Sequence, residues 1–169
     1  MKLKLKEIAL FALLGVLMFT SKKVMEFLPN IHLVGALTVA YTIVFRSKAL
    51  FPIYIYVFLD GLFGGFQPWW IPYLYIWSVL WGAVMLIPKK LPNKFAVPIY
   101  IIICGLHGFL FGVLYSPVQA IMFGLDFKGT IGWIISGLPF DIIHGISNLL
   151  VGTIILPITT VLKKALNKL

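Results

Sequence analysis

The sequence predicts an all-helical, polytopic membrane protein: a bundle of six transmembrane helices with both termini in the cytoplasm. Composition, hydropathy and the placement of charge all favour this fold class. Of the 169 residues, 61% are apolar and 11% are charged, whereas soluble proteins contain roughly 45 to 50% apolar and about 25% charged residues. The mean hydropathy is +1.04. These values exclude an ordinary soluble domain and a disordered chain.

Six apolar stretches lie between short clusters of charge, and each predicts one membrane-spanning helix. At about 20 residues for each crossing, six spans use about 120 residues. We therefore expect a single integral membrane domain over residues 1–169, with no room for a soluble catalytic domain. The expected spans cover approximately residues 8–20, 31–45, 49–66, 70–87, 95–115 and 131–161.

Prolines and charges shape the expected boundaries of the later spans. The sixth span is too long for one straight crossing, so we expect Pro139 and Pro157 to kink or end it. Residues 116–128 form the longest outward connection, for which we expect a short surface helix or a lid. The first span follows three lysines, as a secretory signal does, but no small-x-small cleavage site comes after it. We interpret it as a retained helix.

The distribution of Lys and Arg predicts the orientation. With a cytoplasmic amino terminus, 11 of the 14 basic residues fall inside, and three, Lys22, Lys23 and Lys128, fall outside. This asymmetry follows the positive-inside rule. The net charge of +9 is then a consequence of topology, and we expect no nucleic-acid partner.

With this orientation, most polar side chains of the spans lie in the outer half of the bundle. A charged residue in the bilayer costs about 2.5 to 3.5 kcal/mol on insertion scales, so buried carboxylates should face protein, water or a ligand. We expect a pocket open to the exterior and closed below, unlike a channel or the midplane site of many secondary transporters. Its candidate polar residues are Asn30, His32, Asp60, Gln67, His107, Asp141, His144 and Asn148.

Two local patterns sharpen this hypothesis. Asp141, His144 and Asn148 are spaced i, i+3, i+7, which places them on one face of a helix. Polar contacts between membrane helices contribute only about 0.6 kcal/mol, up to about 1.7, so three on one stripe favour ligand contact over interhelical packing. The second pattern is a set of aromatic residues at the outer start of the fourth span, Trp69, Trp70, Tyr73 and Trp77.

The aromatic residues have two interpretations. Trp and Tyr gather at membrane interfaces for general reasons. Yet Trp70, Tyr73 and Trp77 recur at helical spacing, which suits a wall on which a planar ring stacks. Stacking contributes about 1 to 3 kcal/mol per ring in nucleic-acid systems.

Other chemistries find little support. The three histidines, His32, His107 and His144, fall on three different spans without an HxxxH or HxH pair, so we expect no metal site. His107 is also readily explained as a hydrogen-bonded core residue. No nucleotide-binding loop or hydrolase motif is present, so we expect neither an enzyme nor a cofactor. Small residues permit close contact between helices. On the first two spans they serve either to dock a partner or, equally, to pack helices within this protein, and they are Ala9, Ala12, Gly15, Ala36 and Ala40.

Three segments together resemble a known family. They are LPNIHLVGALTVAYTIVF (residues 28–45), WWIPYLYIW (residues 69–77) and GLPFDIIHGISN (residues 137–148). In a basic six-span chain of this size, they are similar to the substrate-binding S components of energy-coupling factor (ECF) vitamin transporters. The resemblance is strongest to a branch for which the cobalamin precursor 5,6-dimethylbenzimidazole has been proposed as ligand.

The resemblance implies a high-affinity binding subunit in a prokaryotic plasma membrane, which takes up a small planar aromatic vitamin or precursor. It also implies a complex with a transmembrane coupling protein and two cytoplasmic ATPase subunits. One feature departs from the family: its docking motif is an Ala-x-x-x-Ala pair on the first helix, whereas here that spacing, Ala36 to Ala40, falls on the second. The alternatives are a proton-coupled secondary transporter that uses Asp60 or Asp141, and a membrane scaffold without a ligand.

Overall fold

A computed structural model describes residues 3–166, apart from the side chain of Asn93, and within these residues it contains helices and no strand, which confirms the all-helical prediction. The elements are α1 (Leu5–Val24), α2 (Val34–Phe45), η1 (Arg46–Ala49), α3 (Leu50–Gly64), η2 (Pro68–Trp70), α4 (Tyr73–Met85), α5 (Asn93–Phe109), α6 (Phe111–Phe123), α7 (Phe127–Gly152) and α8 (Ile155–Leu166), where η marks a 3-10 helix.

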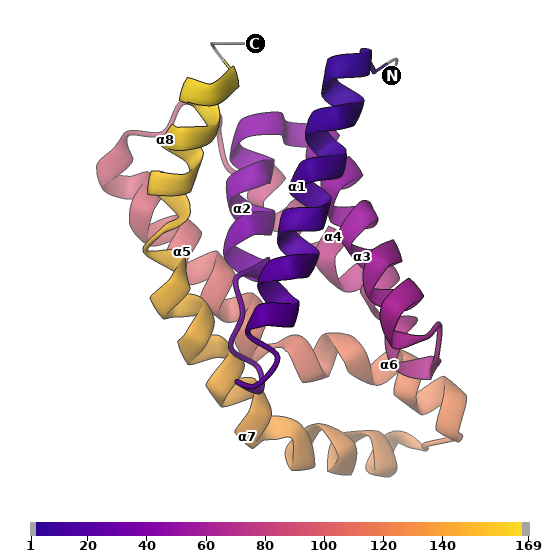
Figure 1. Cartoon of the computed structure of the whole chain (residues 1–169). Coiled ribbons are helices and arrows are strands. Elements are labelled where there is room, and N and C mark those ends of the chain that lie inside the picture. Colours follow the sequence, from indigo (N-terminus) through magenta and orange to yellow (C-terminus); the bar gives the residue numbers. More distant parts are fainter. Residues whose placement is uncertain (1–2, 167–169) are drawn as a thin grey trace.

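The long helices stand roughly side by side, and the two ends of the bundle differ (Figure 1). At one end, called here the terminal end, α1 begins and α8 finishes. At the other, called here the distal end, α1 finishes and α6 lies across the bundle together with the first half of α7. The distal end therefore carries a layer of helix that the terminal end lacks.

Two predicted spans are divided in the structure. The fifth, expected over residues 95–115, ends at Phe109, and α6 begins after a single non-helical residue, Leu110. The expected surface helix over residues 116–128 is thus the later part of a helix that starts earlier. The sixth, expected over residues 131–161, consists of α7 and α8, which are separated at residues 153–154.

The prolines do not make this second break. Pro139 lies inside α7, which continues through it. Pro157 is the third residue of α8, where the backbone N–H that proline lacks would have no partner within the helix in any case. These two prolines were expected to kink or end the span. Pro139 does not end it, and Pro157 lies just after the break.

The surface of α7 has a polarity opposite to that of a helix in a soluble protein. Its buried side chains include Asp141, His144, Ser147 and Asn148, and its exposed side chains include Phe140, Ile142, Ile143, Ile146 and Leu150. Three helical stretches, residues 34–64, 94–123 and 127–152, are long and apolar enough to cross a membrane. The first of them contains α2 and α3, which fold back on each other at η1 (Figure 1). The outer surface suits lipid, as the composition predicts.

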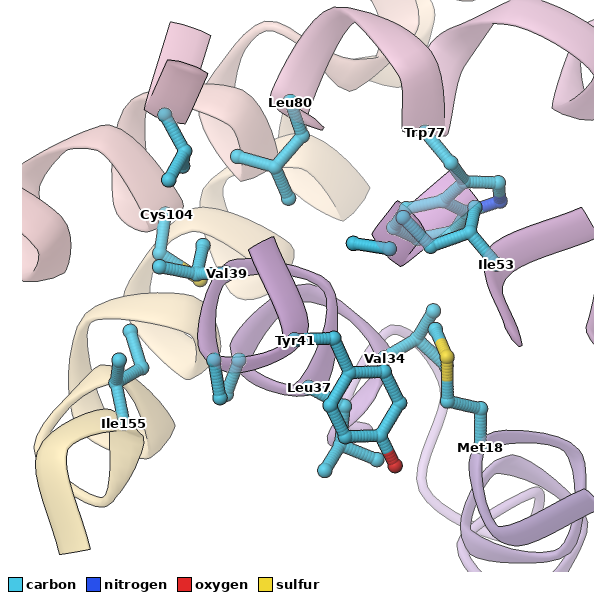
Figure 2. Packing of buried hydrophobic residues seen from close by; sticks show 14 of the residues in the cluster. Met18, Val34, Leu37, Val39, Tyr41, Ile53, Trp77, Leu80, Cys104 and Ile155 are labelled. Atoms are coloured by element: carbon cyan, nitrogen blue, oxygen red, sulfur yellow. The ribbon is translucent and has the colours of Figure 1, made fainter. Parts of the chain in front are cut away.

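An apolar core surrounds α2, and Figure 2 shows its packing. Every residue from Val34 to Thr42 is buried, because α2 packs against α1, α4, α5, α7 and α8. We use the name apolar core for α2 and the buried side chains around it, among them Leu14, Met18, Leu37, Val39, Tyr41, Ile53, Leu80, Val84, Cys104 and Ile155.

Candidate ligand site

Aromatic and imidazole rings from six segments meet on the distal side of the apolar core. We call this set the ring cluster. Its members come from the segment before α2, from α3, α4, α5 and α7, and from the start of α6, and they are His32, Tyr56, Tyr73, Trp77, His107, Phe111 and His144.

Trp77 lies at the centre of the ring cluster. It is 1% exposed, and its ring centroid lies 5.5 Å from that of His107 and 6.2 Å from that of His32. A second series of ring contacts joins His32 to His144, with ring centroids 4.9 Å apart, and His144 to Phe111, with ring centroids 4.8 Å apart. The rings thus form one continuous set, and most pairs meet at tilted or edge-on angles.

Five rings of the cluster carry a buried polar atom that has no hydrogen-bond partner among the described residues. An unpaired buried donor or acceptor costs about 1 to 3 kcal/mol, so several in one place are a feature that folding alone does not favour. On the next turn of α7 the same holds for Ser147 Oγ and Asn148 Oδ1. The five ring atoms are His32 Nδ1, Tyr56 Oη, Trp77 Nε1, His107 Nδ1 and His144 Nε2.

A pocket of about 150 Å³ opens beside the ring cluster at the distal end, and it includes His32 and Tyr73 in its lining. The segment between α1 and α2 forms its rim, with Glu26 and Asn30. Asn30 has a φ of 61°, in the left-handed region that Asn tolerates better than most residues. A hydrogen bond from Lys23 lowers the pKa of Glu26, so the rim carries an ionised carboxylate.

An ion pair lies at the inner edge of this pocket. Lys22 Nζ is 2.6 Å from Asp60 Oδ2, and the Asp60 side chain is only 2% exposed. The same ammonium lies 5.0 Å from the ring centroid of Tyr73 and 5.8 Å from that of Trp69. Asp60 is thus paired with a residue of α1, Lys22, which the sequence placed only on the outer side of the membrane.

Toward the terminal end the same helices bury apolar side chains. Leu80 and Val84 continue the buried face of α4 beyond Trp77, and Val39 continues that of α2 (Figure 2). The hydroxyls that occur there are mostly paired: Tyr41 Oη donates to Leu14 O and Thr42 Oγ1 to Thr38 O. The described residues therefore place the ring cluster between an opening at the distal end and apolar packing toward the terminal end.

The structure brings five of the predicted site residues into direct ring contact within the ring cluster, and they are His32, Tyr73, Trp77, His107 and His144. Asn148 lies one turn away from His144, and its Nδ2 donates to Cys104 O. His107 also has a structural contact, because its Nε2 lies 3.1 Å from Ile76 O.

Other predicted site residues have different roles in the structure. Both oxygens of Asp141 lie 3.1 Å from the backbone nitrogen of Gly112, so this carboxylate caps the start of α6. Trp70 Nε1 donates to Val57 O over 2.7 Å, and Gly61 permits this approach, since a Cβ there would lie 2.6 Å from Trp70 Nε1. Gln67 is exposed in the connection between α3 and η2.

Tyr56 and Phe111 are ring-cluster members that the sequence did not reveal. Tyr56 is hidden in the apolar run of α3, and only its i, i+4 relation to Asp60 would have placed it on the same face. The expected fifth span placed Phe111 within one long helix. Phe111 reaches the cluster because the chain turns at Leu110.

The small residues proposed for docking are split between surface and interior. Ala9 and Ala12 are exposed on α1. Gly15 faces α3, where a Cβ would lie 2.6 Å from Ile55 Cβ. Ala36 and Ala40 are fully buried within α2, which corresponds to the internal-packing alternative. Among residues 3–166, no group of three His, Cys, Asp or Glu side chains is arranged to hold a metal ion.

No family model matches the chain, and no curated protein or solved structure is significantly similar to it.

Proposed function

We propose that this protein is the substrate-binding S component of an ECF-type importer. In this proposal it captures a small planar aromatic vitamin or vitamin precursor, such as 5,6-dimethylbenzimidazole, from outside a prokaryotic cell. The observation that carries the proposal is the ring cluster, in which five rings keep a buried polar atom without a partner beside a pocket that opens at one end.

The unpaired atoms suit a heteroaromatic ligand. Trp77 Nε1 can only donate a hydrogen bond, whereas a neutral imidazole donates through one nitrogen and accepts through the other. A ring with nitrogen acceptors and N–H donors satisfies both kinds of atom, and the flanking Tyr73 and Phe111 provide faces and edges for stacking. The pocket volume of about 150 Å³ is below the roughly 300 to 1,000 Å³ of sites for drug-sized ligands. A compound of one or two rings fits this site best.

The topology that we propose has six crossings: α1, α2, α3, α4, α5, and α7 together with α8. The terminal end then faces the cytoplasm, with basic residues such as Arg46, Lys48 and Lys163, and the distal end faces outward. The pocket opens to the exterior in this orientation. The exposed residues Ala9 and Ala12 lie near the terminal end of α1, within reach of a membrane coupling protein.

Uptake into proteoliposomes tests this function. Vesicles are prepared with the chain alone, and with the chain, a coupling protein and two ATPase subunits, and are offered radiolabelled 5,6-dimethylbenzimidazole and a panel of aromatic vitamins. We expect uptake only with the complete complex and ATP. Uptake by the chain alone, driven by a proton gradient, would instead identify a secondary transporter, and binding of no compound at all would favour a scaffold.

A further inference from the structure

The mouth of the pocket combines a buried carboxylate with aromatic faces around a single cation. Lys22 Nζ contacts Asp60 at 2.6 Å and lies 5.0, 5.8 and 6.0 Å from the ring centroids of Tyr73, Trp69 and Tyr56. We call Asp60 and these three rings the cation cage. Aromatic faces attract a cation within about 6 Å of the ring centroid, and the attraction increases when the cation is shielded from water.

The two charges differ in how firmly the fold holds them. Asp60 lies within α3 and its side chain is 2% exposed, whereas the Lys22 side chain is 19% exposed and belongs to the last turn of α1. A lysine carries its ammonium on a flexible four-carbon stem. Lys22 can therefore leave the cage through a change of rotamer, while the carboxylate and the three rings stay in place.

A second carboxylate is available to a displaced Lys22. Glu26 lines the same pocket, and Lys22 is among the charges that lower the Glu26 pKa, after the hydrogen bond from Lys23. Leaving Asp60 without any cation would be costly, since an unpaired charge at a buried site is strongly unfavourable. The negative charge of Asp60 therefore stays compensated only if the group that replaces the Lys22 ammonium is itself a cation.

We propose that the cation cage is a binding subsite for the positively charged group of the ligand, and that Lys22 fills it in the ligand-free protein. The ligand class is then an aromatic compound with a positively charged nitrogen: a protonated amine, a quaternary nitrogen or a protonated heteroaromatic ring. The ring of this compound enters the ring cluster beyond Tyr73, and its cation replaces the Lys22 ammonium on Asp60. This inference rests on the proposed function, because it assigns the mouth of the same site to the positively charged group of the ligand.

Three small probes of similar shape and different charge test the subsite: benzylamine, benzyl alcohol and benzoate, each titrated into the purified full chain. Lysine labelled with 13C at the ε position reports on Lys22, whose resonance is shifted by the three rings and is assigned by its loss in Lys22→Met. We expect benzylamine alone to move this resonance toward the position of exposed lysines. A shift with benzoate and none with benzylamine would overturn the proposal, because Lys22 would then be an anion receptor.

Variants give an independent readout. Where an internal group occupies a site, the apparent Kd rises by the inverse of the free fraction. Lys22→Met is therefore expected to bind benzylamine about tenfold more tightly or better, and Asp60→Asn about tenfold more weakly or worse. Lys128→Met is the matched control, because Lys128 is an exposed lysine in the first turn of α7 and is part of neither the cage nor the pair with Glu26. Unchanged or weaker benzylamine binding by folded Lys22→Met would contradict the proposal.

The subsite and the proposed function can fail separately. If the complete complex imports no vitamin but benzylamine still displaces Lys22, the cation cage stands and the transport function falls. If a neutral vitamin is imported and Lys22 stays on Asp60 in every titration, the transport function stands and the cation cage falls. Should Lys22→Met fail to fold, Lys22→Arg assigns the same resonance, because it removes the labelled lysine and keeps the positive charge; the shift of that resonance in the unmodified sequence then tests the subsite.

Discussion

The apolar core and the ring cluster are both buried, yet they leave different numbers of polar atoms unpaired: in the described residues, five ring atoms of the cluster, against Thr38 Oγ1 in the α2 helix of the core. In the core, Tyr41 is 0% exposed and its hydroxyl donates to Leu14 O. In the cluster, Tyr56 is also 0% exposed, but its hydroxyl has no partner among the described residues. The two hydroxyls are therefore equally buried, but only that of Tyr41 has a hydrogen-bond partner. We propose that the unpaired polar atoms mark a binding site, because those atoms are available to a ligand.

The helices that carry the ring cluster should be packed as tightly as the apolar core. Gly108→Ala tests this packing, and of all the variants it should change stability most. A Cβ at Gly108 would lie 2.8 Å from both Gly145 Cα and His144 O, so α5 and α7 must separate. We expect a loss of about 1 to 3 kcal/mol in the free energy of unfolding, as for other overpacked sites. Thermal unfolding in detergent measures it.

Gly82→Ala is the matched control for this prediction. Apart from its chain neighbours and the adjacent backbone of α4, no atom of the described residues lies within 4 Å of a Cβ at Gly82, and alanine is favoured over glycine inside a helix by roughly 0.5 to 1 kcal/mol. This variant should unfold at the same or a higher temperature. Equal destabilisation by both substitutions would show that α5 and α7 are not in close contact.

Variants of Asp141 test whether its carboxylate stabilises the fold or binds the ligand. Asp141→Leu removes both acceptors for Gly112 N, and the buried N–H then loses its partner. We expect a cost of about 1 to 3 kcal/mol, with a smaller one for Asp141→Asn, which keeps one acceptor oxygen. Unfolding temperatures of the two variants provide the measurement. A large loss of ligand affinity with unchanged stability would assign Asp141 to the ligand instead.

The two buried tyrosines test whether paired and unpaired hydroxyls differ in their effect on stability. Tyr41→Phe removes a paired hydroxyl and should lower the free energy of unfolding by about 0.5 to 1.5 kcal/mol. Tyr56→Phe removes an unpaired hydroxyl and should leave stability unchanged or slightly raised in the ligand-free protein, while it weakens ligand binding. Denaturation and ligand titration of both variants give the answer. The same loss of stability in Tyr56→Phe would mean that its hydroxyl is already satisfied.

The weakest effect on stability is expected on the exposed face of α1. Ala12→Leu changes a side chain that is exposed in the structure, so the change in stability should stay within about 0.5 kcal/mol. If the coupling protein docks here, uptake by the complete complex falls and ligand binding by the chain alone is retained. Leu13→Ala, at the neighbouring position of α1, is the control for a surface change, since Leu13 is 68% exposed. Unchanged uptake by Ala12→Leu would exclude this face.

Part of the site was predictable because membrane burial restricts where polar residues occur. His32, His107 and His144 were identified from their depth in the expected spans, and Tyr73 and Trp77 from their helical spacing. The structure brings these five rings together. Helical spacing also placed His144 and Asn148 on one buried face. These assignments depend only on local periodicity and the cost of burying polar groups.

The rest depends on contacts between residues far apart in the sequence. The pairing of Lys22 with Asp60 joins α1 to α3, and that of Asp141 with Gly112 depends on the break at Leu110. Gly108 and Gly112 weaken a helix around Leu110, but the residues on both sides continue the apolar run of the expected span, so hydropathy alone does not predict the break. Sequence periodicity reveals which face of a helix is buried, but it does not reveal which neighbour that face meets.

Tryptophan fluorescence of the purified chain, titrated with 5,6-dimethylbenzimidazole and the aromatic vitamin panel, is the sharpest test of the ring cluster as a ligand site. Of the five tryptophans, Trp77 lies among the unpaired atoms, and Trp77→Phe identifies its share of the signal; His144→Leu is the variant that removes one of the unpaired atoms. We predict saturable quenching by at least one compound, and its loss or marked weakening in a folded His144→Leu protein. Quenching by no compound, or the same affinity with and without the imidazole, would contradict this assignment.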